Sequence, residues 1–248
     1  MLHIILLISL VLFFTFGSIV GVKQTKQQLK TDIDEKARVQ HYATITFSMW
    51  IPVIVILLIV AFSDISFADI GFTKLSFDFN FVLTIAVLIL VFLWIAYFLY
   101  RIAAFLFSAK YRKRRNEILA KKASGNDYYD LVESKLMTPR TKKEKRWWFG
   151  ISLTTGICEE IIFRGVFIYL IASIFPNISI HLVFAIAIVL FGLGHFYQGA
   201  KGLMLTTLVG VFFTLVYIVS GSLILVIIMH FITNFANAFE YSDKENIA

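Results

Sequence analysis

Residues 81–107 read FVLTIAVLILVFLWIAYFLYRIAAFLF, and Arg101 is the single charged residue in this stretch. A helix needs about 20 predominantly apolar residues to cross the hydrocarbon core of a bilayer. The stretch is longer than that, so we expect a spanning helix that is tilted or that leaves the core near Arg101. It predicts that the chain is a membrane protein.

The composition of the whole chain supports the same conclusion. Of its 248 residues, 59% are hydrophobic and only 16% are charged, whereas about a quarter of the residues in a soluble domain are charged. The length suits six to eight membrane helices with short loops and leaves no room for a second, soluble domain. The predicted fold class is therefore all-α, a polytopic transmembrane helix bundle.

Six further apolar runs accompany the quoted stretch. Together they predict seven spans, at residues 2–22, 42–62, 81–107, 147–175, 180–197, 202–219 and 222–239. The positive charges near the first run follow it, at Lys23, Lys26 and Lys30. A secretory signal peptide has its positive charge before the apolar core, so we interpret this run as a spanning helix.

The basic residues predict the topology. Residues 23–41 hold five Lys and Arg and residues 108–146 hold 13, out of 23 in the chain. Cytoplasmic loops are enriched in Lys and Arg, so we expect the N-terminus outside and the C-terminus in the cytoplasm. The net charge of +7 is assigned to topology and to membrane lipid headgroups, and no nucleic-acid partner is expected.

The same pattern predicts three parts of the chain. Residues 1–108 would form N-terminal transmembrane helices, residues 109–146 a basic cytoplasmic loop, and residues 147–240 a transmembrane core. The composition is also rich in Ile, Phe and Lys, which favours an AT-rich genome, such as that of a Gram-positive bacterium. We therefore expect a multi-pass protein of a bacterial plasma membrane.

Polar side chains that are costly in a membrane are concentrated in the last four predicted spans. An ionisable group near the bilayer centre costs about 2.5–3.5 kcal/mol on insertion scales, so such groups persist when they are paired or useful. The first three spans hold nothing comparable in their interiors. The candidate site residues are Glu159, Glu160, Arg164, His195, His230 and Asn234.

Helical geometry separates the two adjacent carboxylates. Glu160 and Arg164 are four residues apart and share one helix face, so they can form an ion pair. Glu159 is rotated by about 100° from Glu160 and is less directly neutralised. One carboxylate would then be structural and the other free for chemistry, although a static network in which both share Arg164 stays open.

The remaining groups suit water activation. A lone histidine in an apolar helix is more often a hydrogen-bonded core residue, but His195 and His230 lie on separate predicted spans beside a buried glutamate. A carboxylate can take a proton from water, two neutral imidazoles can hold zinc, and the Asn234 amide can donate a hydrogen bond to an oxyanion. Together they form one coherent chemical set.

Three motifs in this half of the chain resemble those of a known family. They are E-E-x-x-x-R, F-x-x-x-H and H-x-x-x-N, at Glu159–Arg164, Phe191–His195 and His230–Asn234. In this order on successive spans they resemble the CPBP family of CAAX proteases and bacteriocin-processing enzymes (Abi-like), which includes the type II CAAX prenyl endopeptidases. The resemblance covers about residues 137–239.

The resemblance implies an intramembrane endopeptidase. In that family pattern Glu159 is the catalytic glutamate, His195 its partner on the attacking water, and His230 with Asn234 completes the site. Glu160 and Arg164 support the motif helix. The substrate would be a membrane-associated peptide or a lipidated protein, and the sequence does not choose between prenylated proteins and a bacterial peptide precursor.

Two mechanisms are compatible with these residues. Glu159 and His195 could activate water without a metal, or Glu159, His195 and His230 could hold a divalent metal ion such as zinc. We favour the metal, because two buried imidazoles invite one.

Two other functions remain open from the sequence. A non-enzymatic bacteriocin-immunity or signalling-regulator protein could use the same scaffold, but binding alone does not need Glu159. An ion or proton transporter could use the buried groups as a relay. Glycine- or proline-broken helices in both halves would favour a transporter, and we find none in the sequence.

Overall fold

The computed structural model describes residues 1–31, 33–77 and 80–242, and within these ranges it contains helices and no strand. The predicted all-α class is confirmed. The elements are α1 (Leu2–Gln28), α2 (Glu35–Ala61), α3 (Phe81–Phe107), α4 (Ala109–Ser124), α5 (Tyr128–Lys135), α6 (Lys142–Glu160), η1 (Ile161–Val166), α7 (Phe167–Ile174), α8 (Ile180–Gly194), η2 (Phe196–Gln198), α9 (Gly199–Ser220), α10 (Leu223–Phe235) and η3 (Ala236–Phe239).

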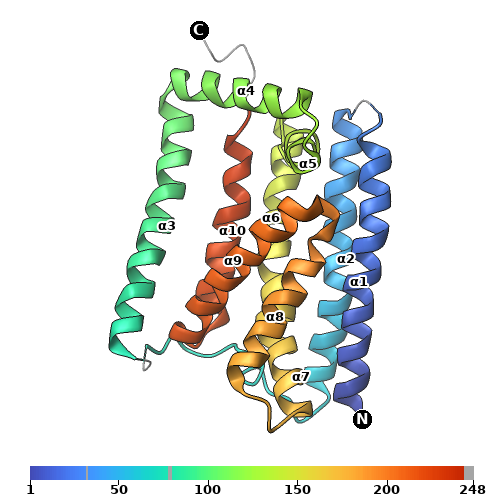
Figure 1. Cartoon of the computed structure of the whole chain (residues 1–248), viewed down its shortest axis with the longest axis vertical. Coiled ribbons are helices and arrows are strands. Elements are labelled where there is room, and N and C mark those ends of the chain that lie inside the picture. The colour runs from blue at the N-terminus through green and yellow to red at the C-terminus, as the bar shows by residue number, and fades with distance from the viewer. Residues whose placement is uncertain (32, 78–79, 243–248) are drawn as a thin grey trace.

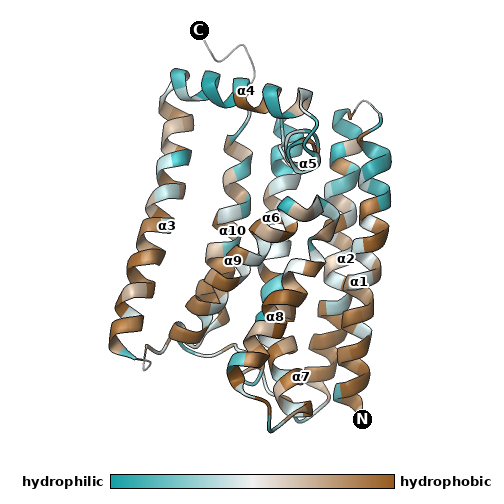
Figure 2. Cartoon of the chain, in the orientation of Figure 1, coloured by the Kyte–Doolittle hydropathy of each residue, from teal (hydrophilic) through white to brown (hydrophobic). Residues whose placement is uncertain are grey.

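Several of these helices have the length and composition of membrane spans. Four are long and apolar enough to cross a bilayer: α1, α2, α3 and the continuous segment Phe196–Ser220. The helices Ile180–Gly194 and Leu223–Phe239 are apolar but shorter. The chain is thus a multi-pass membrane protein, and the count of seven spans remains a prediction. Figure 2 shows the apolar residues along the lower two thirds of the bundle.

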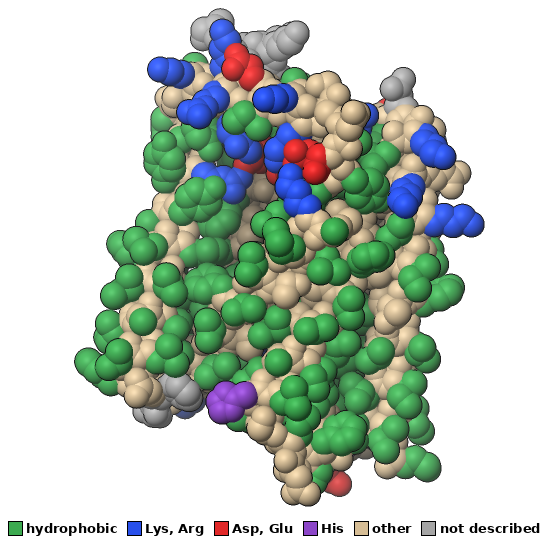
Figure 3. All heavy atoms as spheres, in the orientation of Figure 1, with side chains coloured by type: hydrophobic (Ala, Val, Ile, Leu, Met, Phe, Trp, Pro, Cys, Tyr) green, Lys and Arg blue, Asp and Glu red, His purple; other side chains and the backbone are tan. Residues whose placement is uncertain are grey.

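The charged residues gather at one end of the molecule. In Figure 3 the Lys and Arg side chains on the visible face cluster at the end that α4 occupies. In Figure 1, α4 lies across this end, at a steep angle to the long helices, and the N-terminus lies at the opposite end. This separation follows from the preference of charged side chains for water, and the cytoplasmic location of the basic end remains a prediction.

The predicted basic loop contains two helices. Ser108 caps the start of α4 and Asp127 caps the start of α5, each by accepting a backbone N–H bond. A capping box formed by Thr141 and Glu144 starts α6, so the boundary predicted at Trp147 falls inside a helix. The Lys, Arg, Glu and Ala residues of this segment favour helix formation, which explains why a polar segment is helical and not a loop.

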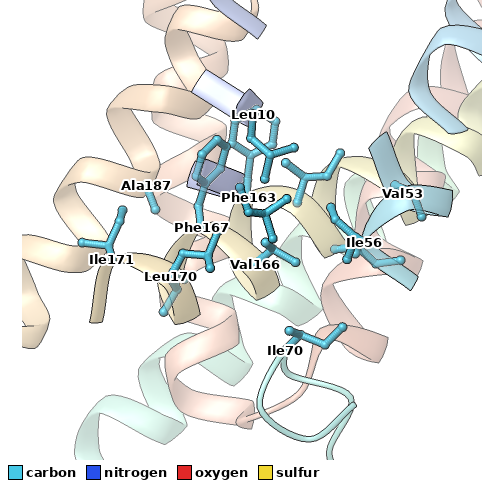
Figure 4. Packing of buried hydrophobic residues seen from close by; sticks show 14 of the residues in the cluster. Leu10, Val53, Ile56, Ile70, Phe163, Val166, Phe167, Leu170, Ile171 and Ala187 are labelled. Atoms are coloured by element: carbon cyan, nitrogen blue, oxygen red, sulfur yellow. The ribbon is translucent and has the colours of Figure 1, made fainter. Parts of the chain in front are cut away.

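The core surrounds the middle of the continuous helical stretch α6–η1–α7. Phe163, Phe167 and Leu170 are buried there, between residues of α1, α2 and α8 that include Leu10 and Ile56. Figure 4 shows this packing, in which the aromatic rings of the stretch point toward α1. Because the stretch is central, its polar residues can contact α8, α9 and α10.

Helices α6 and α10 are in close contact next to the site, which brings their polar side chains together. A Cβ atom added to Gly156 would lie 3.1 Å from the backbone nitrogen of Phe231, so a glycine allows the two backbones to approach. Small residues have this function at helix interfaces in membranes. One turn beyond the contact lie Glu159 and Glu160 on α6, and His230 is adjacent to Phe231 on α10.

Candidate active site

A π-helical segment follows the two adjacent glutamates. Residues Ile161–Val166 form η1 between α6 and α7, and all of them are buried. Single π-helical turns inside α-helices occur frequently at functional sites. A Cβ at Gly165 would lie 2.6 Å from the carbonyl oxygen of Ile70, so only glycine fits at this point of the segment. The π-helical segment therefore begins directly after the two glutamates and packs tightly against Ile70 at Gly165.

Glu160 is the structural carboxylate of the pair. Its Oε1 atom accepts from Arg164 Nη1 at 2.9 Å and from His230 Nδ1 at 2.6 Å, and the Glu160 side chain is fully buried. The predicted Glu160–Arg164 pair is confirmed. Among the described residues Arg164 forms no ion pair with Glu159, so the two carboxylates do not share the guanidinium.

Arg164 is enclosed by α8 and α9. Its guanidinium carbon lies 4.1 Å from the ring centroid of Phe191, and Nη2 donates to the carbonyl oxygen of Gly210 at 3.4 Å. A cation over an aromatic face is attracted by the ring quadrupole, more so where water is absent. These contacts hold Arg164, and through it Glu160, in one position.

Glu159 faces both histidines. Its Oε2 atom lies 3.6 Å from His195 Nε2 and 3.9 Å from His230 Nε2. This oxygen is buried and has no hydrogen-bond partner among the described residues. Side chains from α6, the C-terminal end of α8 and α10 therefore converge on the Glu159 carboxylate.

The hydrogen-bond partner of each histidine Nδ1 determines whether the Nε2 atom that faces Glu159 carries a hydrogen. His195 Nδ1 lies 2.9 Å from the carbonyl oxygen of Phe191, and His230 Nδ1 lies against the Glu160 carboxylate. Both partners only accept, so each Nδ1 carries the hydrogen, and a neutral ring then presents an Nε2 lone pair. Two nitrogen lone pairs and a carboxylate oxygen therefore face one another, an arrangement that calls for a water molecule, a proton or a cation as their shared partner.

Asn234 lies one turn after His230 on α10. Its Nδ2 donates to Thr155 Oγ1 at 2.9 Å, and its backbone oxygen accepts from Trp148 Nε1 at 2.7 Å. Thr155 was not predicted from the sequence, although it lies four residues before Glu159, on the same face of α6. The structure brings Asn234 to the glutamate helix and holds its amide beside the site.

Two further residues beside the site were not predicted from the sequence. The Tyr197 ring stacks near His195, with centroids 6.2 Å apart and planes at 28°. The Phe213 ring lies 5.5 Å from the His230 ring. Both come from the η2–α9 segment, whose one charged residue, Lys201, bonds Asp130 of α5 and not the site.

The donor set is of the kind that binds zinc. Both Nε2 atoms are free, and each Nδ1 donates to an acceptor, as the outer ring nitrogen of a metal-ligating histidine does. Ligand atoms about 2.0–2.1 Å from zinc lie roughly 3.3 Å apart at tetrahedral angles, so the 3.6 and 3.9 Å separations are wider than that geometry. Within the described residues no group of three or more His, Cys, Asp or Glu has the arrangement of a metal site. The donor atoms are of the types that bind a metal, and the distances between them are longer than in an occupied tetrahedral site.

The fold and the site together define a class. This is a multi-pass membrane protein with a glutamate and two histidines converging among apolar helices. Residues 143–236 match the family model described as Type II CAAX prenyl endopeptidase Rce1-like, and this segment belongs to that family, so the resemblance inferred from the motifs is confirmed. Comparisons with curated proteins and with solved structures found no match.

The matched segment contains all six candidate site residues and begins at the start of α6. At the level of the family, the match supports a CAAX-type intramembrane protease, and therefore a hydrolase. Helices α1 to α5 lie outside the match.

Proposed function

We propose that the protein hydrolyses a peptide bond of a membrane-associated or lipophilic substrate by activating water between Glu159, His195 and His230. The observation that carries the proposal is the convergence of both Nε2 atoms on the unpartnered Glu159 Oε2. A buried carboxylate without a partner is costly in an apolar environment. Such a cost is typical of functional sites, where a group is kept for chemistry and not for stability.

In the proposed mechanism a water molecule occupies the space between the three side chains. The water donates hydrogen bonds to Glu159 and to His195 Nε2, and its oxygen attacks the substrate carbonyl carbon. Glu159 takes the proton as general base and delivers it to the leaving amine nitrogen when the C–N bond breaks. His230, whose Nδ1 is held by Glu160, contributes a third acceptor beside the water and would serve as a metal ligand.

The oxyanion that forms on the substrate needs a hydrogen-bond donor. The Asn234 amide is positioned one turn from His230 and has a second N–H besides the one that it donates to Thr155. We assign the oxyanion contact to this amide. A preorganised donor in a water-poor site stabilises the transition state more strongly than the same donor in water.

A divalent metal is part of the proposal. Glu159, His195 and His230 would hold it, and a bound zinc ion would supply a water molecule whose pKa is lowered to about 7.

Metal removal tests this part directly. We expect dialysis of the detergent-purified protein against 1,10-phenanthroline to abolish cleavage. Zinc should restore it, because the two imidazole nitrogens and the carboxylate form a ligand set for a cation. The metal content of the purified protein should fall from about one ion per chain in the wild type to near zero in a His195→Ala His230→Ala double variant. Full activity of a metal-free sample would leave Glu159 and His195 as the sole activating groups.

The proposed location is a bacterial plasma membrane, and the proposed substrate is a peptide or a lipidated protein held in the lipid phase. Many of the large apolar side chains on the membrane helices are exposed, which suits lateral contact with lipid and with such a substrate. Glu159 of α6 and His230 of α10 are buried, and His195 at the C-terminal end of α8 is partly buried.

Cleavage in a defined membrane tests the proposal. The purified chain would be reconstituted into liposomes with two quenched fluorescent probes, a farnesylated peptide with a CAAX terminus and an unlipidated apolar peptide. We expect cleavage of at least one probe, and none by the Glu159→Gln and His195→Ala variants.

His181→Ala is the matched control for the histidine variant. It removes an imidazole from the same helix at its exposed opposite end, about 21 Å away by helix rise, and should cleave like the wild type. Cleavage that persists in Glu159→Gln would refute the mechanism. Absence of cleavage with both probes, together with tight binding of one of them, would favour a non-enzymatic immunity or regulatory function.

A further inference from the structure

Helix α1 contacts the turn that carries His195. Although most of α1 is exposed on the outside of the bundle, Ser18 is buried, with 7% of its surface exposed. The Ser18 hydroxyl lies 2.8 Å from the carbonyl oxygen of Gly194 and 3.1 Å from that of Leu193. These two residues immediately precede His195, at the C-terminal end of α8.

The end of α8 leaves carbonyl groups without helical partners, as every helix end does. The Phe191 carbonyl accepts from the His195 ring and the Gly192 carbonyl from the His195 backbone N–H, each at 2.9 Å. The single hydrogen of the Ser18 hydroxyl is shared between the next two carbonyls, those of Leu193 and Gly194, and the Gly194 oxygen is the nearer. The hydroxyl thus contributes a donor to a helix end whose carbonyls lack helical partners.

The same face of α1 packs around the turn in two other places. A Cβ added to Gly21 would lie 3.3 Å from Tyr197 Cβ, and a Cβ added to Gly194 would lie 3.9 Å from Phe14 Cδ1. Phe14 and Gly21 are one turn before and after Ser18, so the three residues share a helix face. This face supports the segment from Gly194 to Tyr197 along its length.

We infer that Ser18 is a positioning residue for His195, acting from a helix that lies outside the family-matched segment. By holding the Leu193 and Gly194 carbonyls, it maintains the turn in which His195 Nδ1 reaches the Phe191 carbonyl. That bond keeps the lone pair of Nε2 directed at Glu159. The inference rests on the proposed function of His195 and adds a residue that the three motifs do not contain.

Loss of the Ser18 hydroxyl should change the position of the His195 ring without unfolding the protein. In Ser18→Ala the Leu193 and Gly194 carbonyls lose the hydroxyl that they share, and the turn is expected to rearrange toward another donor, the His195 ring included. We expect kcat per folded molecule to fall about tenfold with KM nearly unchanged, below the roughly 100-fold cost of a 1 Å misplacement. Ser18→Thr keeps the hydroxyl and should restore most of the activity.

The decisive measurement does not depend on a substrate. Solid-state NMR of ¹⁵N-histidine-labelled protein in liposomes would report the protonation of each ring nitrogen, with the His195 signals assigned by their loss in His195→Ala. The wild type should show a protonated Nδ1 and an unprotonated Nε2 for His195. Ser18→Ala should give mixed or broadened signals, and Ser18→Thr should restore the wild-type pattern.

Thr15→Val is the matched control, because it removes a hydroxyl from an exposed position one turn earlier on α1. It should leave the His195 signals unchanged. If Ser18→Ala is not obtained folded, Ser18→Cys replaces the hydroxyl with a weaker donor of similar size and takes its place.

Unchanged His195 signals in the Ser18 variant overturn the inference, and so does an equal change in Thr15→Val. The failure of the proposed function has a separate signature, which is cleavage that survives Glu159→Gln. Wild-type His195 signals in Ser18→Ala together with inactive Glu159→Gln would reject the positioning role alone.

Discussion

Glu159→Gln is expected to abolish cleavage while leaving the fold intact or more stable. General-base catalysis contributes about 10²–10⁴-fold, so kcat should fall by roughly 10³-fold with little change in KM. The amide has nearly the same shape as the carboxylate but cannot take a proton from water. The buried Glu159 Oε2 has no hydrogen-bond partner among the described residues, so replacing its charge removes a desolvation cost and no stabilising contact.

The neighbouring Glu160→Gln is the matched control for this prediction. It makes the same chemical change one residue away, but on a carboxylate that holds Arg164 and His230. It should lower both activity and stability, whereas Glu159→Gln lowers activity alone. Cleavage rates in liposomes and thermal unfolding in detergent separate the two outcomes. A Glu159→Gln protein that unfolds as readily as Glu160→Gln would show that Glu159 has a structural function instead.

Arg164→Met is expected to have the largest effect on stability. The guanidinium lies in a fully buried environment between Glu160, the Phe191 ring and the Gly210 carbonyl. Its removal leaves the Glu160 carboxylate buried without its counter-ion, and breaking a buried pair in this way costs about 3–5 kcal/mol. The free energy of unfolding, measured by titration with SDS in mixed micelles, should fall by that amount.

Arg164→Lys distinguishes charge from shape at the same position. Lysine keeps the positive charge but lacks the planar fork that reaches Glu160 and Gly210 together and stacks on an aromatic ring. We expect it to recover part of the stability and less of the activity, because Glu160 also orients His230. A second comparison, the double variant Arg164→Met Glu160→Leu, should be more stable than Arg164→Met, since no unpaired charge is then buried. Equal stability of the two would show that the ion pair is not the cause.

The adjacent carboxylates show how far local sequence reasoning reaches. The spacing of four residues predicted the Glu160–Arg164 pair, and the offset of about 100° indicated that Glu159 would be less directly neutralised, with a network in which both share Arg164 left open. Both expectations depend only on helix geometry. The assignment of His230 Nδ1 to Glu160 could not be obtained in this way, because the two residues are 70 positions apart and the rotation of α10 decides which ring nitrogen faces which carboxylate.

The basic segment shows the opposite limit. Its charge predicted a polar region at the basic end of the bundle, and the structure contains α4 and α5 there, where a loop was expected. Ser108 and Asp127 cap the starts of these helices, and both residue types are favoured at that position. Charge determined where this segment lies, and the caps and the helix propensity determined its conformation.

The amino-acid sequence by itself determined that the chain is a helical membrane protein, that its polar groups lie in the C-terminal half, and that Glu160 pairs with Arg164. Hydrophobicity and helical spacing act over a few residues, so they can be read locally. The tertiary structure decided which histidine nitrogen faces Glu159, that Thr155 holds Asn234, and that Ser18 reaches a carbonyl 176 residues away. These contacts depend on how separate helices rotate and pack against one another, which no local spacing specifies.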